Sequence, residues 1–126
     1  MWQYVRMPLF HIAEIQDWRS AQASGAYVRS TRGASLAEVG FVHCSLRDQV
    51  GRVGTFIYAD GGAGELVVLE LDDARVAASG ADVRLEDGGT GELFPHVYGP
   101  LDPAWVVKVH PVRAGGGSFF WGAEAC

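Results

Sequence analysis

Apolar residues recur with two different periods along this chain, and these periods predict where helices and strands lie. Alternating or continuous apolar runs predict strands at residues 9–12, 26–30, 41–45, 66–73, 81–88 and 105–112. Apolar positions three and four residues apart predict helices over 13–24 and from Ser45 to about Tyr58, with one helical turn over 35–40. Helices come early and strands late, without regular alternation. We therefore expect an α+β fold with two or three helices and a mostly antiparallel sheet.

Two of the predicted strands also indicate their position or facing in the sheet. The strand at 66–73 is the most continuously apolar segment, so we expect it at the centre of the sheet. In the strand that follows, a period of two separates Val83 and Leu85 from Arg84 and Glu86. The charged pair is either an exposed ion pair of little energetic value or a wall of a cleft. In a cleft, Arg84 would hold a phosphate or carboxylate, and Glu86 a hydroxyl or a developing positive charge.

The final strand is predicted to turn Trp105, Val107 and Val109 toward the core, which leaves His110 beside Lys108 on the exposed side. The Ser45 hydroxyl is the expected N-cap of the helix that follows it.

The chain divides into one central domain and two peripheral ends. Residues 9–112 form the predicted domain, preceded by an N-terminal extension at residues 1–8. Residues 113–126 contain a glycine triplet at 115–117, which predicts a flexible linker, followed after one serine by Phe-Phe-Trp at 119–121. These aromatic side chains are too apolar to stay in water. We expect the tail to dock on the domain or on a second copy of the chain, as in a homodimer.

The segment GELFPHVYGP at 91–100 is predicted to be a loop of unusual composition, because aromatic side chains and a histidine lie between glycines and prolines. The prolines restrict the backbone and so reduce the entropy lost when the loop orders. We expect apolar residues of the loop to anchor it in the core. His96 and Tyr98 would then point into a cleft beside His43.

Composition limits the kinds of partner. The net charge of −5, with acidic and basic residues interspersed, argues against non-specific nucleic-acid binding and suits a small-molecule ligand. Two cysteines, Cys44 and Cys126, make no disulfide framework and fit a reducing compartment. No signal peptide or run of about 18 apolar residues is present, so we expect a cytoplasmic protein with no membrane association.

Three of the four histidines lie in apolar surroundings: His11, His43 and His96. All three could be structural histidines with both ring nitrogens satisfied. Their spacing matches no compact metal-binding motif, so no metal is expected. The remaining chemistries are acid–base catalysis on a phosphate ester by two histidines and a nucleotide pocket in which imidazoles and hydroxyls bind ribose.

Two neighbours of His43 could act as nucleophiles. Cys44 points to the opposite strand face from His43, so it is expected to pack in the core rather than form a thiolate–imidazolium pair. Ser45 shares the His43 face, so its hydroxyl could serve chemistry as well as helix capping.

Several motifs together resemble a known bacterial family. They are LFHI at 9–12, GFVHCS at 40–45, VVLELD at 67–72, VRLE at 83–86 and GELFPHVYGPL at 91–101. In this combination they resemble the family called domain of unknown function 952, over about residues 9–112.

The resemblance implies a fold similar to that of ADP-ribosyltransferases, with a split, curved sheet around a cleft that binds NAD. By position, His11 matches the element that holds a ribose, and His43 with Ser45 matches the second element. The third element, which often supplies a strand-borne glutamate, has no clear match here. The segment at this position offers His96 and Tyr98, with Glu92 four residues before His96.

The leading hypothesis from the sequence is therefore a cleft that binds NAD or a related nucleotide and transfers ADP-ribose. The expected catalytic residues are His43, His96 and Glu92, and the expected ligand-binding residues are His11, Ser45, Arg84, Glu86 and Tyr98. The alternatives are a non-catalytic interaction module and a histidine-dependent phosphate-ester hydrolase.

Overall fold

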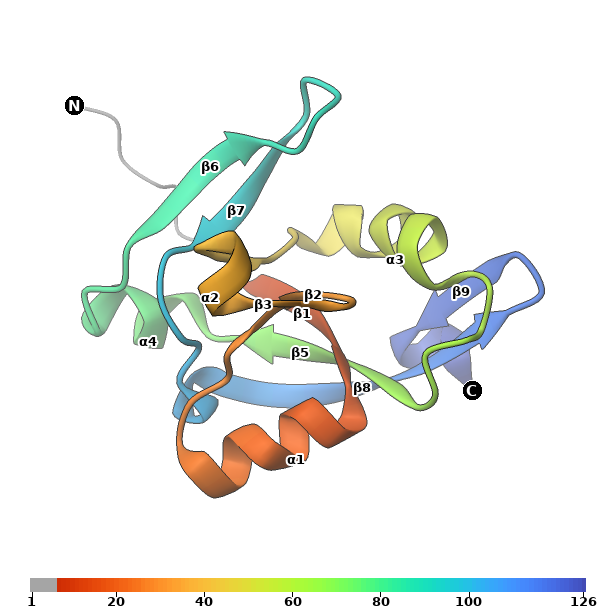
Figure 1. Cartoon of the computed structure of the whole chain (residues 1–126), viewed down its shortest axis with the longest axis horizontal. Helices are drawn as coiled ribbons and strands as arrows, with labels where there is room; N and C mark the ends of the chain where they lie inside the picture. The colour runs from red at the N-terminus through yellow and green to blue at the C-terminus, as the bar shows by residue number, and fades with distance from the viewer. Residues whose placement is uncertain (1–6) are drawn as a thin grey trace.

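The computed structural model describes residues 7–126 and contains a split antiparallel sheet with four α-helices (Figure 1). The strands are β1 (Leu9–Glu14), β2 (Arg29–Thr31), β3 (Ala34–Ser35), β4 (Val42–His43), β5 (Leu66–Leu71), β6 (Val83–Asp87), β7 (Leu93–Val97), β8 (Val106–Gly115) and β9 (Ser118–Trp121). The helices are α1 (Ile15–Ser24), α2 (Leu36–Val39), α3 (Val50–Tyr58) and α4 (Asp73–Ala78). Short 3₁₀ turns are η1 (Arg47–Gln49), η2 (Pro103–Trp105) and η3 (Gly122–Ala125). Of the predicted N-terminal extension, residues 1–6 lie outside the described residues.

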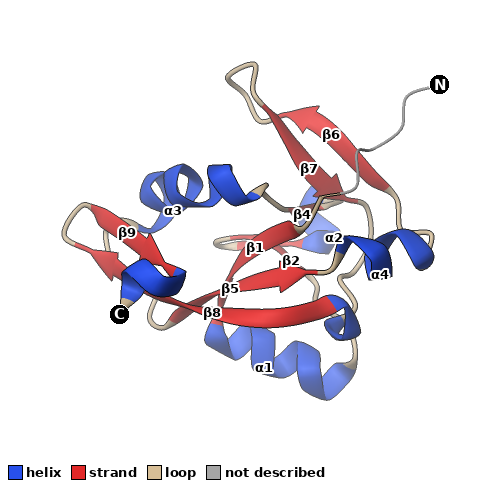
Figure 2. Cartoon of the chain, turned by 180° about the vertical axis from the view of Figure 1, so that it is seen from behind, coloured by secondary structure: helices blue, strands red, loops and turns tan. Residues whose placement is uncertain are grey.

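The sheet is split into a four-stranded part, ordered β1-β5-β8-β9, and a three-stranded part, ordered β4-β7-β6. Every strand pair is antiparallel. The two parts meet at one bridge, where Phe10 and Ser45 exchange both backbone hydrogen bonds. Because the chain crosses from one part to the other at this point, the β6–β7 hairpin rises away from the larger sheet (Figures 1 and 2).

Both faces of the central strands are buried, which explains their continuous apolar sequence. Along β1, Leu9 packs with Trp18 of α1 in one core, while Phe10 and Ile12 pack with Val50 of α3 in a second core. Each fully buried side chain of this size contributes about 1.5–3 kcal/mol. Strand β5 lies between β1 and β8, which confirms its predicted central place.

Local capping explains where the early helices end. Gly25 and Gly40 take the left-handed conformation after α1 and α2, with φ of 88° and 97°. Ser35 and Glu38 form a capping box at the start of α2. The predicted helix at 13–24 and the helical turn at 35–40 are therefore confirmed. The short helix α4 was not predicted, although Asp72 caps it through its side chain.

Ser45 was predicted to be the N-cap of the helix that follows it, and this prediction is wrong. Its backbone is used by the bridge to Phe10, and the helical region begins later, with η1. The Gln49 side chain takes over the capping function, since its amide oxygen accepts a hydrogen bond from the backbone N–H of Leu46.

The prediction of a loop at 91–100 is also wrong, because residues 93–97 form β7, the middle strand of the smaller sheet. Proline is unusual in a middle strand, since it has no N–H to donate. The Pro95 carbonyl still accepts from the Cys44 N–H at 3.0 Å. Directly after Cys44, the segment that follows β4 turns away from β7, and Ser45 pairs with Phe10 instead. The missing N–H of Pro95 therefore removes little hydrogen bonding between β4 and β7.

The end of the chain differs from the prediction in two respects. His110 is buried at 6% exposure, while Val107 and Val109 are 49% and 40% exposed, so the predicted facing of this strand is wrong. The glycine triplet is the turn of the β8–β9 hairpin rather than a linker, and β9 packs Phe119 in the second core. The predicted boundary at residue 112 therefore falls inside β8. Within residues 7–126, no helix has the length and apolar character needed to cross a bilayer.

Candidate functional site

One face of the smaller sheet gathers most of the polar residues expected to act. His43 of β4 lies opposite His96 of β7, and His96 lies opposite Arg84 of β6. Directly opposite residues in an antiparallel pair share a face, and so do residues two positions away. Glu86 and Tyr98 therefore lie on the same face, while the valines of the three strands point into the core.

The polar side chains on this face form a continuous hydrogen-bonded chain. Glu86 accepts hydrogen bonds through one carboxylate oxygen from Tyr98 O–H and from His96 Nδ1–H, the latter at 2.9 Å. His96 Nε2 lies 3.4 Å from His43 Nδ1. The ring of Phe41 stacks on His96 with centroids 3.9 Å apart. We call Glu86, His96 and His43 the histidine relay.

The carboxylate sets the direction of the relay. An ionised carboxylate only accepts hydrogen bonds, so His96 carries its proton on Nδ1. When His96 is neutral, its Nε2 is then an acceptor for His43 Nδ1–H. This leaves Nε2 of His43 without a proton. No other described residue hydrogen-bonds that nitrogen, so it is available to accept a proton or a hydrogen bond from a ligand.

Burial keeps His43 neutral. Desolvation, followed by the nearby His96, lowers the pKa of His43 from 6.5 to about 4. The pKa of Glu86 is held below its usual range by its hydrogen bonds from Tyr98 and His96, so it stays ionised near neutral pH. The two ends of the relay are thus a carboxylate and a neutral imidazole.

His11 lies under the relay, and both of its ring nitrogens are already used. Its Nδ1–H donates to the carbonyl of His43 at 2.6 Å, and its Nε2 accepts from the Tyr27 hydroxyl at 2.8 Å. The space between His11 and Ser45 measures only about 10 Å³, room for at most one water molecule. The geometry therefore makes His11 a positioning residue for the His43 backbone.

Two adjoining pockets meet at His43. One, of about 320 Å³, reaches toward Phe94, Glu92 and α3, and the other, of about 300 Å³, reaches toward Phe41 and β2. His43, Ile57 and Gly88 line both pockets. This volume is in the range of small-molecule sites.

Two of the charged residues expected at the site, Glu92 and Arg84, instead form ion pairs with residues that were not expected there. Glu92 makes a two-pronged ion pair with Arg52 at 2.8 Å for both bonds and also accepts from Gln49. These contacts lower the pKa of Glu92 to about 2. Arg84 pairs with Asp82 and lies 4.1 Å over the Tyr98 ring. Neither Glu92 nor Arg84 hydrogen-bonds the histidine relay within the described residues.

Ser30 was not identified from the sequence. It is fully buried and lines the pocket next to β2, and its hydroxyl has no hydrogen-bond partner among the described residues. A buried hydroxyl left unpaired costs about 1–3 kcal/mol, so such a group points to a partner that a ligand or water supplies. The only sequence signal was a serine in a short predicted strand.

The described residues contain no group of three or more His, Cys, Asp or Glu side chains arranged to hold a metal ion.

The model of the family described as "Protein of unknown function (DUF952)" matches residues 12–109. The chain is similar in structure to protein CC0527 from Caulobacter crescentus, with a TM-score of 0.72 and 21% identity over 90% of this chain and 94% of that one. A double mutant of CC0527 gives the same TM-score with 22% identity over the same shares of the two chains. A comparison with curated proteins gave no match.

Proposed function

We propose that this chain, which belongs to the DUF952 family, binds the nucleoside end of a nucleotide such as NAD in the two pockets around His43. The family description assigns no activity, so the proposal rests on the site itself. The observation that carries it is the bare Nε2 of His43, held by the histidine relay at the meeting point of two pockets.

The groups around His43 suit a hydroxylated, ring-bearing ligand. An imidazole nitrogen without a proton accepts a hydrogen bond from a ribose hydroxyl. The unpaired hydroxyl of Ser30 offers a second polar contact. Phe41 and Phe94 line the two pockets and provide aromatic surface for a base or a nicotinamide ring.

The charges favour the nicotinamide–ribosyl end of NAD over its pyrophosphate. Among residues 7–126, Arg52 is the one arginine or lysine that lines the two pockets, and Glu92 already neutralises it. Asp87 brings a further carboxylate to these walls, hydrogen bonds from backbone N–H groups lower its pKa, and it forms no ion pair within the described residues. Nicotinamide carries a positive charge while attached to ribose, so this acidic, aromatic pocket suits that end. The pyrophosphate would extend out of the pockets.

The expected resemblance to ADP-ribosyltransferases belongs to this proposal, and the split antiparallel sheet supports it. In transfer, the hydroxyl oxygen of an acceptor forms a bond to the ribose carbon, and nicotinamide leaves with the electrons of the broken C–N bond. The acceptor's proton passes to His43 Nε2, and the Nδ1 proton of His43 moves to His96. Glu86 stabilises the imidazolium that forms. The pocket carboxylates stabilise the positive charge on the ribose.

Ligand-detected NMR tests the proposal. Saturation transfer is measured from the protein to NAD, ADP-ribose, nicotinamide and nicotinamide riboside at millimolar concentration. Transfer to the nicotinamide riboside protons of NAD, lost in His43→Phe but retained in the matched variant His110→Phe, is the expected result. A folded protein that shows no transfer to any of the four ligands refutes the proposal.

The same relay could activate a water molecule, so ester hydrolysis is the second candidate function. His43 would take the proton of the water, and the relay would carry the charge. Its test is the rate of hydrolysis of aryl phosphates and aryl carboxylates. A rate that Glu86→Gln and His43→Gln both reduce, in a protein that fails the NAD test, assigns this function instead.

A further inference from the structure

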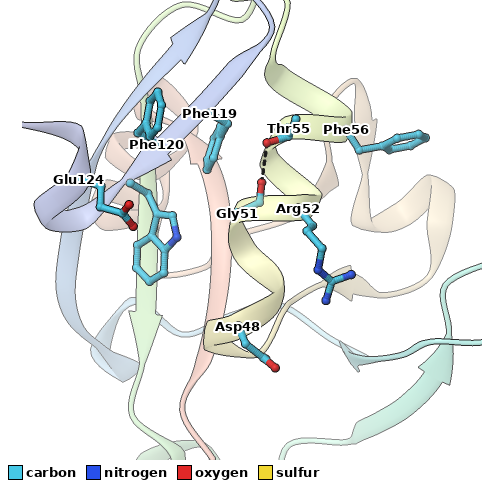
Figure 3. Close-up of a pocket in the computed structure, with 9 residues that line it drawn as sticks. Asp48, Gly51, Arg52, Thr55, Phe56, Phe119, Phe120 and Glu124 are labelled. Carbon is cyan, nitrogen blue, oxygen red and sulfur yellow. Dashed lines mark hydrogen bonds between the residues drawn. The ribbon is translucent and has the colours of Figure 1, made fainter.

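A second concave surface lies on the other side of α3, away from the histidine relay. We call it the tail groove, because η1 and α3 form one wall and β9 with η3 forms the other (Figure 3). Its volume is about 600 Å³, larger than either pocket around His43. Phe119 fills the bottom of the groove, where its ring lies against Gly54. Above it, Gly51 leaves open space, since a side chain there would meet no atom within 4 Å.

The tail groove combines aromatic surface with negative charge. Phe120 and Trp121 supply the aromatic surface, while Asp48 and Glu124 are exposed carboxylates at its wall. Neither carboxylate forms an ion pair within the described residues. Arg52 is the one arginine or lysine of the described residues that lines the groove, and it donates two hydrogen bonds to Glu92 of the β6–β7 hairpin. The groove therefore presents beside aromatic rings two carboxylates that form no ion pair within the described part of the chain, although Arg52 still acts electrostatically on Asp48.

Aromatic rings beside carboxylates are the surroundings that a guanidinium group prefers, through cation–π contact and charge-assisted hydrogen bonds. The same rings already contact cations within this chain. Arg113 lies 4.6 Å from the centre of the Phe120 ring, and Arg47 lies 5.9 Å from that of Trp121. Neither arginine lines the groove, so both leave its interior free.

From this charge complementarity we propose that the tail groove binds a peptide segment that presents an arginine or lysine side chain. The aliphatic part of that side chain would lie against Phe120 and Gly51, and its charged end would reach Asp48 and Glu124. Arg52 and Phe56 line both the tail groove and the pocket beside Phe94. A bound segment would thus lie one helix width from the candidate functional site. The proposal does not depend on the function proposed for that site.

The test follows the Trp121 indole N–H and the Gly51 amide by NMR during titration with a capped Ala-Ala-Arg-Ala-Ala peptide. Matched peptides carry lysine or the neutral isostere citrulline at the centre. We expect saturable shifts with the arginine and lysine peptides, and binding at least about tenfold weaker with citrulline. Each exposed ion pair is worth up to about 1 kcal/mol. Asp48→Asn and Glu124→Gln should therefore each weaken binding by about two- to fivefold.

Two further variants separate the groove from general effects of charge and folding. Gly51→Leu projects a side chain into the groove from a position where an added Cβ meets no atom within 4 Å, and it should abolish the shifts in a folded protein. Glu65→Gln removes the same charge from an exposed position outside the groove and should leave binding unchanged. Equal affinity for arginine and citrulline peptides, or equal weakening by Glu65→Gln, overturns the proposal. Sedimentation that shows a dimer abolished by Gly51→Leu would assign the groove to a second copy of the chain and would also overturn it.

Discussion

Acidification should destabilise this fold through two buried imidazoles, and His11, whose ring is the more deeply buried, can be tested by comparing the wild type with a variant that keeps His43. Burial lowers the pKa of His11 from 6.5 to about 4, and this effect outweighs the hydrogen bond to the His43 carbonyl, which raises it. Between these two values the unfolded chain binds a proton that the folded chain excludes. The stability that neutral His11 provides is therefore complete above pH 6.5 and is lost progressively as the pH falls toward about 4.

The size of this loss follows from the two pKa values. Each tenfold difference in proton affinity is about 1.4 kcal/mol, so the His11 contribution amounts to about 3 kcal/mol. That is a large fraction of the roughly 5–15 kcal/mol by which a domain is stable. In His11→Gln the side chain has no proton to exclude, and its amide can donate to one neighbour and accept from the other. The variant should be less stable at neutral pH but less sensitive to acid.

The measurement is the free energy of unfolding in urea for the wild type and His11→Gln at several pH values between neutral and about 4. Taking the difference between the two proteins cancels the contributions of carboxylates that both share. We expect the difference to change by about 3 kcal/mol over this range. A difference that stays constant within about 0.5 kcal/mol would refute the reasoning, because the His11 ring would then exclude no proton in the folded state.

Other consequences follow from single contacts. Gly54→Ala should destabilise the protein by about 1–3 kcal/mol, because the new methyl group would overlap the Phe119 ring. Gly51→Ala, one turn earlier in open space, should instead stabilise it by up to about 1 kcal/mol. Thermal unfolding of both variants checks this pair, and equal effects would contradict it. Glu86→Gln should lower the raised pKa of Tyr98, since the carboxylate hydrogen bond is its largest cause. Ultraviolet titration should show the Tyr98 phenol ionising at a lower pH in Glu86→Gln than in the wild type, and an unchanged curve would count against the hydrogen bond between Glu86 and Tyr98.

The hydrophobic period and the composition of the sequence predicted those strands whose surroundings follow directly from their own residues. Strand β5 is apolar on both faces, and its sequence indicated a central place that the structure confirms. The facing of Arg84 and Glu86 was predicted correctly because a period of two needs no knowledge of the partner strand.

The errors arose where a strand depends on a distant partner. The glycines and prolines of 91–100 predict a loop where the structure has strand β7, and Pro95 is tolerated in this middle strand because the chain of β4 leaves β7 to pair with Phe10. His110 was expected to be exposed because the alternation of valines seemed to decide the facing of β8. Its Nε2 pairs with Glu70 at 2.7 Å, a contact that no local pattern encodes.

The candidate site was predicted as a group of residue types but not as a chain of contacts. His43, His96, Glu86 and Tyr98 do come together on one face. The distinction between Glu86, which holds His96, and Glu92, which holds Arg52, depends on which strands pair. Sequence spacing carries no information about that choice.

The central claim is that the histidine relay presents an unprotonated Nε2 of His43 to a ligand. Its most direct measurement is the ¹⁵N shift of the histidine ring nitrogens at neutral pH, during titration with nicotinamide riboside. The account predicts a proton on Nδ1 and none on Nε2 of His43 before the titration. On addition, the Nε2 shift of His43 should move as it accepts a hydrogen bond, while the nitrogens of His11 stay unchanged. A His43 that carries its proton on Nε2, or that does not respond to the ligand, would contradict it.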